Sequence, residues 1–293
     1  MYYAGIDIGG TSVKLGVMDE NRQLVWEHAI PSVINDPQGM ADAIAAALRT
    51  APYTVAAAGI SCAGRVDRLR RCVTASNLRW MRVPFHPMMT AALGCPVAID
   101  NDVAGAMYGE WRMGAAKGIG NLVYFTIGTG IGSAMLLNGR PFRGHDNTAG
   151  EAGHMITHAD GEPCPCGGHG CWERYASASA LERRAGMSCR EVFARAAAGD
   201  AQADAVLEDY VHELCIGLSN ICCILYPAVI MLGGGITGAG DALLDRIRRQ
   251  MRDKRPGLVS QEPPEIILAT LGNKAGVIGG CMMAMDLLAE GAQ

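Results

Sequence analysis

The stretch Asp7-Ile8-Gly9-Gly10-Thr11-Ser12-Val13-Lys14 is decisive for the fold, because a similar stretch follows at Thr126-Ile127-Gly128-Thr129-Gly130-Ile131-Gly132-Ser133. In both, a β-patterned segment enters a turn of glycine and threonine, and a second β-patterned segment leaves it. P-loops and dinucleotide-binding loops are followed by a helix, so neither motif fits here. A single turn of this kind usually only reverses the chain, although its N–H groups can hold a phosphate. Two such turns in matching positions predict duplicated domains that bind one polyphosphate from both sides.

Length and composition favour a globular protein of two domains. The chain has 293 residues, of which 49% are hydrophobic and 18% charged, and its formal net charge is −4. Such a chain can bury a sizeable core, and its negative charge disfavours nucleic acid as a partner. The N-terminus lacks a basic signal region, and no run reaches the roughly 18 apolar residues of a membrane span. We therefore expect a cytoplasmic protein that binds neither nucleic acid nor membrane.

Hydrophobic periodicity predicts strands and helices alternating in both halves of the chain. Strands are expected at 3–8, 12–18, 23–30, 55–61, 97–99, 122–127, 133–137, 229–232 and 266–271. Helices are expected at 37–50, 102–113, 241–252 and 275–288, with Asp36 as a possible N-cap of the first. Arg65–Arg71 is expected to be a polar turn, and Met155–Trp172 is too rich in Cys, Gly and His for regular structure.

A cluster of cysteines indicates a metal site. Cys164, Cys166 and Cys171 place three thiols within eight residues of a Gly-rich loop, and His154, His158 and His169 are nearby. Three cysteines and one histidine form a closed tetrahedral zinc site, which is structural because no position is left open for a substrate. The alternative is three ordinary thiols in a loop, but thiols gathered in a polar, Gly-rich loop do not resemble core packing.

Several acidic residues follow glycine turns or the cysteine loop. Asp100-Asn101-Asp102 comes directly after an apolar run, Glu151 and His154 follow Gly150, and Glu173 lies two residues after Cys171. Any one of these acids is most simply a solvated side chain or a helix cap. Together they match a ligand that is rich in hydroxyl groups.

These motifs, in this order, resemble the ROK family of sugar kinases and repressors. The resemblance spans nearly the whole chain, and its most specific part is Glu-Ala-Gly-His at 151–154 followed by the cysteine motif that ends in Glu173. Family repressors carry an added N-terminal helix-turn-helix segment, whereas the first glycine turn here begins at residue 7, which favours a kinase. Ala63-Gly64 replaces the Pro-Gly of many members, and Ser76-Asn77-Leu78-Arg79-Trp80 resembles the family's Asn-Leu-x-Trp loop.

The resemblance implies an α/β protein with the actin-like ATPase (ribonuclease H-like) fold, in which two similar α/β domains flank a central cleft. We expect an N-terminal domain over 1–112 and a C-terminal domain with the zinc loop over 113–274, with a helix at about 275–290 returning to the first domain. The apolar, Met-rich stretch Met282–Leu288 could serve a dimer interface or pack on its own domain. A homodimer or higher homo-oligomer is expected, as is common in the family.

The resemblance also implies ligands residue by residue. Residues for ATP and its magnesium ion would be Asp7, Gly9, Gly10, Thr11, Lys14, Gly128, Thr129, Gly130, Gly233, Gly234 and Gly235. Residues for the sugar would be Gly64, Arg65, Asn77, Asn101, Asp102, Glu151, His154 and Glu173. A structural zinc ion would be held by His154, Cys164, Cys166 and Cys171.

The implied reaction is transfer of the ATP γ-phosphoryl group to a hexose hydroxyl, most simply the 6-hydroxyl of glucose or a related sugar, with Asp102 as general base. Alternatives are an N-acetylmannosamine kinase, another ROK sugar kinase, or a non-catalytic sugar sensor of the same fold. A sensor would keep the sugar residues and lose the base or the phosphate loops.

Overall fold

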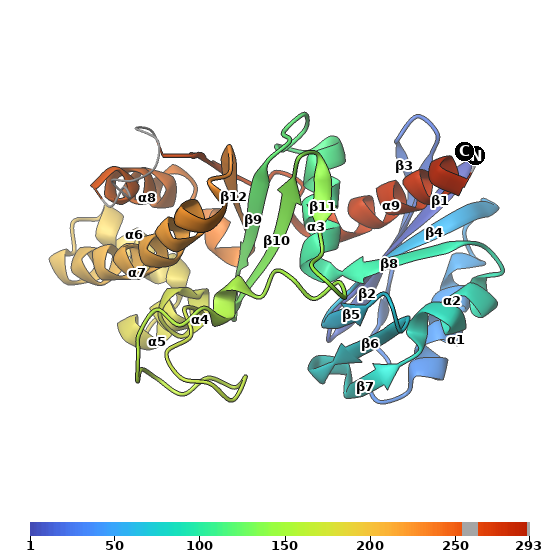
Figure 1. The fold of residues 1–293 in the computed structure, drawn as a ribbon, viewed down its shortest axis with the longest axis horizontal. Coiled ribbons are helices and arrows are strands. Elements are labelled where there is room, and N and C mark those ends of the chain that lie inside the picture. The colour runs from blue at the N-terminus through green and yellow to red at the C-terminus, as the bar shows by residue number, and fades with distance from the viewer. Residues whose placement is uncertain (254–262, 292–293) are drawn as a thin grey trace. The chain divides into compact units, whose positions relative to one another are not determined.

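The computed structural model describes residues 1–253 and 263–291, and two five-stranded sheets of identical topology organise them (Figure 1). The first sheet has the order β3-β2-β1-β4-β8 and the second β11-β10-β9-β12-β13. The first contains β1 (Tyr2–Ile8), β2 (Ser12–Asp19), β3 (Leu24–Pro31), β4 (Val55–Cys62) and β8 (Val97–Asn101). The second contains β9 (Leu122–Ile127), β10 (Ile131–Leu137), β11 (Arg140–Phe142), β12 (Val229–Gly233) and β13 (Glu265–Leu268).

The matching topology confirms the duplication predicted from the two glycine turns. In each sheet the first strand pairs antiparallel with the strand after the turn, β1 with β2 and β9 with β10. On its other side the first strand pairs parallel with a later strand, β4 or β12, which in turn pairs parallel with the edge strand. Each glycine turn therefore lies at the carboxyl end of a central strand.

The chain divides into two compact units. Unit 1 comprises Met1–Gly118, Pro141–Ala149 and Thr270–Gln293, and unit 2 comprises Ile119–Arg140 and Gly150–Ala269. The helices of unit 1 are α1 (Pro37–Leu48), α2 (Phe85–Leu93), α3 (Asp102–Met113) and α9 (Ala275–Gly291). Those of unit 2 are α4 (Glu173–Ala176), α5 (Ala178–Ala185), α6 (Cys189–Ala197), α7 (Ala201–Leu225) and α8 (Asp241–Asp253). Sequence reasoning did not anticipate that Pro141–Ala149 belongs to unit 1.

In unit 1, residues of β1 alternate between two covered faces of the sheet, as expected for a buried strand. Ile6 and Ile8 belong to the core that contains α1 and α2 side chains, whereas Gly5 faces α9. The absence of a side chain lets α9 approach closely, because a Cβ at Gly59 would lie 2.0 Å from the carbonyl oxygen of Gly280. The sheet is therefore sandwiched between the α1–α2 pair and the α3–α9 pair.

The methionines of α9 pack within their own unit. Met282 and Met283 are buried together with Met18, Tyr108 and other apolar side chains. Of the two roles considered for this stretch, the structure supports internal packing for these two residues. Self-association stays a prediction from the family resemblance, and light scattering tests it.

Unit 1 also contains a small meander, which the sequence did not predict. Arg65–Asp67 forms β5, where a polar turn was expected, and it pairs with β6 (Cys72–Ala75), which pairs with β7 (Trp80–Val83). The turn itself is shorter and covers the residues between β5 and β6. Three residues are too few for a period-2 pattern to stand out from a charged turn.

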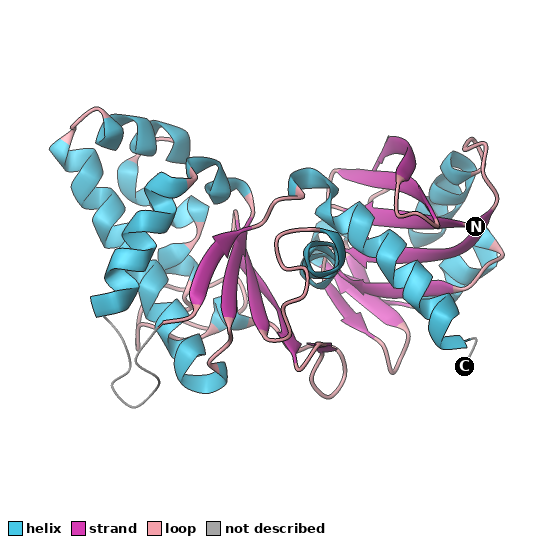
Figure 2. Ribbon diagram, turned by 90° about the horizontal axis from the view of Figure 1, so that it is seen from above, coloured by secondary structure: helices cyan, strands magenta, loops and turns pink. Residues whose placement is uncertain are grey.

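Unit 2 is mostly helical outside its sheet, and its core joins the helices to β9 and β12 (Figure 2). Trp172 is fully buried, meets Phe125 edge to face, and donates its indole N–H to the carbonyl oxygen of Glu213 on α7 at 2.9 Å. This contact fixes the end of the cysteine loop on the longest helix. No helix within the described residues has both the length and the apolar character needed to cross a membrane.

Candidate functional site

In unit 1 the carboxyl ends of three neighbouring parallel strands bring acidic residues together. Ile8 of β1 pairs with Cys62 of β4, and Cys62 pairs with Asn101 of β8. Asp7 and Asp102 therefore lie at the ends of strands on either side of β4. Burial raises the pKa of the Cys62 thiol, and the negative charges of Asp102 and Asp7 raise it further. Ligands of open α/β sheets bind at such strand ends.

Asp7 is a largely buried carboxylate with a cationic neighbour. Its Oδ2 lies 3.4 Å from Nζ of Lys14, which comes from the adjacent strand β2. Burial raises the pKa of Asp7 above its ordinary value, and the Lys14 ammonium offsets part of that rise. Gly276, near the start of α9, leaves room for this carboxylate, because a Cβ there would lie 2.7 Å from Cγ of Asp7.

Asp102 is the first residue of α3 and is oriented by its neighbours. Asn101 caps the helix by accepting the backbone N–H of Ala104 at 2.7 Å, and its Nδ2 donates to Oδ1 of Asp102 at 3.2 Å. The backbone N–H of Val103 donates to the same oxygen at 3.0 Å. The N-terminal end of a helix favours a negative charge, so Asp102 is held as an acceptor of hydrogen bonds.

The first glycine turn lies beside Asn77, a residue predicted from the sequence to bind sugar, in unit 1. The backbone N–H of Gly9 donates to the carbonyl oxygen of Ser12 at 3.0 Å, which closes the turn around Gly10 and Thr11. A Cβ at Gly10 would lie 3.1 Å from Cβ of Asn77, a residue of the 3₁₀ turn η1 (Ser76–Leu78).

Gly64 and Arg65 lead into β5. Gly64 has φ +107 and a Cβ there would meet the carbonyl oxygen of Thr74 at 2.5 Å, so only glycine fits. Arg65 is exposed and pairs with Asp146 at 3.0 Å. Of the unit 1 residues chosen from the sequence, the structure places Asp7 beside Lys14, Gly10 beside Asn77 and Asn101 beside Asp102, while Gly9 and Thr11 flank Gly10, and Gly64 and Arg65 follow the carboxyl end of β4.

In unit 2 the second glycine turn and the triple glycine lie at the ends of adjacent strands. Gly233 of β12 pairs with Thr126 of β9, so Gly128–Gly130 and Gly233–Gly235 follow neighbouring strand ends. Gly234 has φ +86, and a Cβ there would lie 2.5 Å from the carbonyl oxygen of Ile127. Thr129 in the first turn and Gly234-Gly235 in the second are exposed at the carboxyl ends of these strands, which suits the close approach of a phosphate or a nucleoside.

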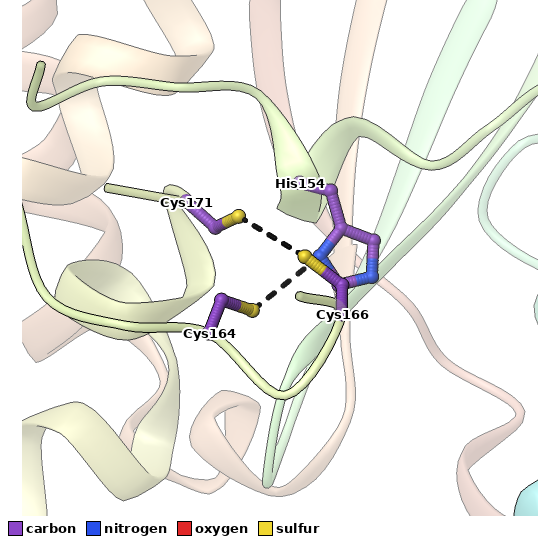
Figure 3. A group of neighbouring side chains, drawn as sticks. All are labelled: His154, Cys164, Cys166 and Cys171. Atoms are coloured by element: carbon purple, nitrogen blue, oxygen red, sulfur yellow. Dashed lines mark hydrogen bonds between the residues drawn. The ribbon is translucent and has the colours of Figure 1, made fainter. Parts of the chain in front are cut away.

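Four metal-ligating side chains converge in unit 2 (Figure 3). The ligand atoms of His154, Cys164, Cys166 and Cys171 all lie within 4.8 Å of one another. Sγ of Cys166 and Cys171 are 3.6 Å apart, and Sγ of Cys164 is 3.8 Å from Nδ1 of His154. A tetrahedral zinc site with metal–sulfur bonds of about 2.3 Å has edges of about 3.8 Å. The residues therefore fit a structural zinc ion with four protein ligands.

The thiols of this cluster differ in how readily they lose a proton. Burial raises the pKa of Cys164 to about 12 and raises the pKa of Cys171 as well. The backbone N–H of Gly168 donates to Sγ of Cys166 and lowers the pKa of that thiol. Zinc must therefore displace protons from the two buried thiols, so metal binding is coupled to proton release.

Glu173 connects the metal cluster to the second glycine turn. Its Oε1 lies 3.2 Å from Sγ of Cys164 and 3.6 Å from Nδ1 of His154, and its Oε2 accepts the backbone N–H of Ile131 at 3.4 Å. His154 ends the 3₁₀ turn η2 (Ala152–His154), with Nε2 4.0 Å from Oε2 of the exposed Glu151. The histidine thus presents Nδ1 to the thiols and Nε2 to Glu151.

Sequence reasoning missed residues that hold these parts in place. Arg143 and Asn147 bind the buried Asp100, and the fully buried Glu110 accepts hydrogen bonds from the backbone N–H groups of Thr270 and Leu271 at 2.7 Å each. These partners are distant in the sequence, so no local spacing could reveal them. One indication of a role near the site was present in the sequence, which is that Arg143 and Asn147 shortly precede Glu151.

Known proteins resemble the chain over its whole length. It matches the model of the ROK family over residues 3–287. It is 34% identical to the glucokinase of Streptomyces coelicolor over 308 aligned positions, which cover 96% of this chain and 97% of that protein.

Solved structures of ROK family kinases also resemble the chain over its whole length. A ROK family glucokinase from Streptomyces griseus, in complex with glucose and AMPPNP, superposes with a TM-score of 0.82 at 31% identity and covers 98% of this chain and 100% of its own. The ROK hexokinase of Thermus thermophilus superposes with a TM-score of 0.83 at 30% identity, covering 99% and 100%. The chain therefore belongs to the ROK family and has the actin-like ATPase fold that the resemblance implied.

Proposed function

We propose that the chain is an ATP-dependent hexokinase that phosphorylates the 6-hydroxyl of glucose or of a closely related sugar. Two relatives named glucokinase or hexokinase match it over nearly their full length at 30% identity or more. The observation that carries the proposal is the placement of Asp7 and Asp102 at strand ends on either side of β4, beside a glycine turn. One carboxylate suits the metal–phosphate side of the reaction and the other suits the hydroxyl.

Asp102 would act as general base. Its Oδ1 is occupied by hydrogen bonds from Asn101 and Val103, which fix the orientation of the carboxylate. The sugar hydroxyl would donate its proton to this carboxylate as the oxygen attacks the γ-phosphorus in line. Phosphoryl transfer depends mainly on positioning and charge neutralisation, so a fixed carboxylate at this place is sufficient as the protein's proton acceptor.

The ATP phosphates would be held by backbone and by one cation. Gly9, Gly10 and Thr11 offer N–H groups and a hydroxyl, and Lys14 lies beside Asp7. Magnesium bound with ATP would neutralise charge on the phosphate oxygens, with Asp7 orienting it through water. Gly128–Gly130 would bind phosphate and Gly233–Gly235 would pass along the adenosine, since both follow the carboxyl ends of neighbouring strands.

The family resemblance implies acceptors and donors for the sugar in each unit. In unit 2 these are Glu151, Glu173 and Nε2 of His154, which lies 4.0 Å from Glu151 and can bind a hydroxyl when Nδ1 binds zinc. In unit 1 they are Asn101, Asp102, Asn77 and the Gly64-Arg65 loop. The zinc ion would have a structural role. It would fix the positions of His154 and Glu173, so that both side chains can bind the sugar.

A coupled assay of ADP release with a panel of hexoses tests the proposal. We expect turnover with glucose or a near relative, and N-acetylmannosamine, mannose, allose and fructose belong in the panel because they present similar hydroxyls. Sugar binding without ADP release for every hexose would contradict the proposal and favour a sugar sensor.

A further inference from the structure

The segment Pro141–Ala149 has an unusual path. Its first two residues end β11 of the second sheet and its last residue precedes Gly150-Glu151 of unit 2, yet by its contacts the segment belongs to unit 1. Within unit 1 its side chains bind Asp100, Arg65 and the carbonyl oxygen of Val66. Arg143 and Asn147 bind Asp100, and Asp146 pairs with Arg65. These contacts join the segment through its side chains to β8 at Asp100 and to β5 at Arg65 and Val66.

Asp100 is a buried carboxylate that depends on this segment. The residue is 3% exposed, and its Oδ2 accepts Nε of Arg143 at 2.9 Å. Its Oδ1 accepts Nδ2 of Asn147 at 3.1 Å and the backbone N–H of Asn101 at 2.9 Å. A buried charge is tolerated only when it is paired and hydrogen-bonded, so Arg143 and Asn147 are what allow Asp100 to occupy this place.

A short chain of hydrogen bonds leads from Asp100 to Asp102. Asp100 holds the backbone N–H of Asn101, and the Asn101 side chain holds both the start of α3 and Oδ1 of Asp102. A shift of Asp100 therefore moves the residue that orients Asp102.

We propose that Arg143 and Asn147 are positioning residues, which clasp Asp100 and through it set the orientation of Asp102 for phosphoryl transfer. The proposal rests on the proposed kinase function. One part of it, that the contacts of Arg143 and Asn147 with Asp100 order the turn Asp100–Asp102, can be tested without an activity assay. Asp100 and Asn101 connect both residues to Asp102 by hydrogen bonds.

Asn147 offers the cleaner of two variants. Its φ is +70, in the left-handed region that asparagine and glycine adopt with least strain. Nδ2 gives one proton to Asp100 and the other to the carbonyl oxygen of Val66, at 3.1 Å each. Asn147→Gly therefore removes both hydrogen bonds and keeps the backbone conformation. Replacement of Arg143 by an uncharged residue would remove a salt bridge from the buried Asp100 carboxylate and destabilise the fold, so Arg143→Lys, which keeps the positive charge, is the second variant.

The matched control is Asn138→Gly. Asn138 is exposed, lies in the turn between β10 and β11, and has φ +52, so the substitution changes backbone freedom in the same way. We expect Asn147→Gly to lower kcat by about tenfold or more, because small misplacements of a catalytic group are costly. KM for MgATP should stay within about twofold. Arg143→Lys should lower kcat by a smaller factor, and Asn138→Gly should match the wild type.

Hydrogen exchange of the same proteins supplies the independent measurement. The amides of Asn101, Val103 and Ala104 should exchange faster in Asn147→Gly than in the wild type or Asn138→Gly. An unchanged exchange rate overturns the proposal, and so does faster exchange with an unchanged kcat. A wild-type protein that phosphorylates no hexose would refute the proposed function, while the exchange rates would still decide whether the clasp orders this turn.

Discussion

The carboxylate of Glu173 accepts the backbone N–H of Ile131 at 3.4 Å, while its other oxygen lies 3.2 Å from Sγ of Cys164. One side chain thus links the metal cluster to the strand that leaves the Gly128–Gly130 turn. Gly130 makes this contact possible, because a Cβ there would lie 2.5 Å from Oε2 of Glu173. A change at the cysteines should therefore reach the glycine turn.

Loss of the metal should impair sugar use. We expect about one zinc ion per chain in the wild type and close to none in Cys166→Ser, by elemental analysis. Because His154 and Glu173 then lose their support, KM for glucose should rise about tenfold or more, as is typical when groups around a metal are disturbed. Cys223→Ser is the control, since Cys223 is also exposed but lies on α7. Full activity in a metal-free preparation would contradict a supporting role for zinc.

Zinc affinity should increase with pH. Burial raises the pKa of Cys164 to about 12 and also raises that of Cys171, so at neutral pH these thiols carry protons that the metal must displace. Competition with a chromophoric chelator between pH 6 and pH 8 measures the affinity. Once the chelator's own protonation is corrected for, an affinity independent of pH would mean that the buried thiols do not bind the metal.

Asp102→Asn should remove the general base with little effect on the fold. We expect kcat to fall by about two orders of magnitude or more, the usual range for such a group, while sugar affinity stays nearly intact. Asparagine still accepts the hydrogen bonds at the start of α3. Asp36→Asn is the control, because Asp36 caps α1 and asparagine caps equally well. Near-normal turnover in Asp102→Asn would exclude Asp102 as the base.

Asp7→Asn should separate stability from activity. Burial raises the pKa of Asp7, so the folded state disfavours its charged form, and above that raised pKa the carboxylate lowers the free energy of unfolding. Without magnesium, the Tm of Asp7→Asn should equal or exceed that of the wild type at pH 7. The difference should shrink as pH falls towards the ordinary value of an aspartate, where the wild-type carboxyl is also neutral.

Activity of the same variant should fall at least as far as that of Asp102→Asn, because Asp7 is proposed to orient the magnesium ion. Thermal unfolding from pH 4 to pH 8 in the presence of EDTA, together with the ADP assay, makes the comparison. A Tm that drops below the wild type at every pH would show that the Asp7–Lys14 pair stabilises the fold more than burial of the charge destabilises it.

Much of the fold could be predicted because its signals are local. Each glycine turn lies between segments whose periodicity predicts strands, and both turns proved to be hairpins in sheets of equal topology. Asp36 was recognised as an N-cap from its position before a helical pattern. Three of the four proposed zinc ligands lie within eight residues, so their grouping follows from the chain itself.

The features that escaped prediction depend on long-range contacts. Asp100 and Arg143 are 43 positions apart, and Glu110 and Thr270 are 160 apart. From the sequence, a single aspartate or glutamate is assigned to the surface, since most acidic side chains are solvated, and only its partners in the fold show otherwise. For the same reason the assignment of Pro141–Ala149 to unit 1 could not be anticipated.

ATP and sugar should strengthen each other's binding. The family resemblance implies residues from both halves of the chain for each ligand, so each ligand should favour the conformation that binds the other. Calorimetry of a non-hydrolysable ATP analogue with and without glucose should give a higher affinity with the sugar, and the reverse titration should give the same factor, because linkage is reciprocal. Equal affinities in both titrations would contradict this coupling.

The central claim is that this chain transfers phosphate from ATP to a hexose. ³¹P NMR of the purified protein with MgATP and glucose, or the best hexose of the panel, follows the reaction and identifies its product directly. The account predicts that the γ-phosphate signal is replaced by that of a sugar 6-phosphate, with ADP formed in equal amount. It also predicts that ATP is consumed at least about a hundredfold more slowly when sugar is omitted, because the attacking hydroxyl is missing. ATP loss that yields only inorganic phosphate, or no loss with any hexose that binds, would contradict it.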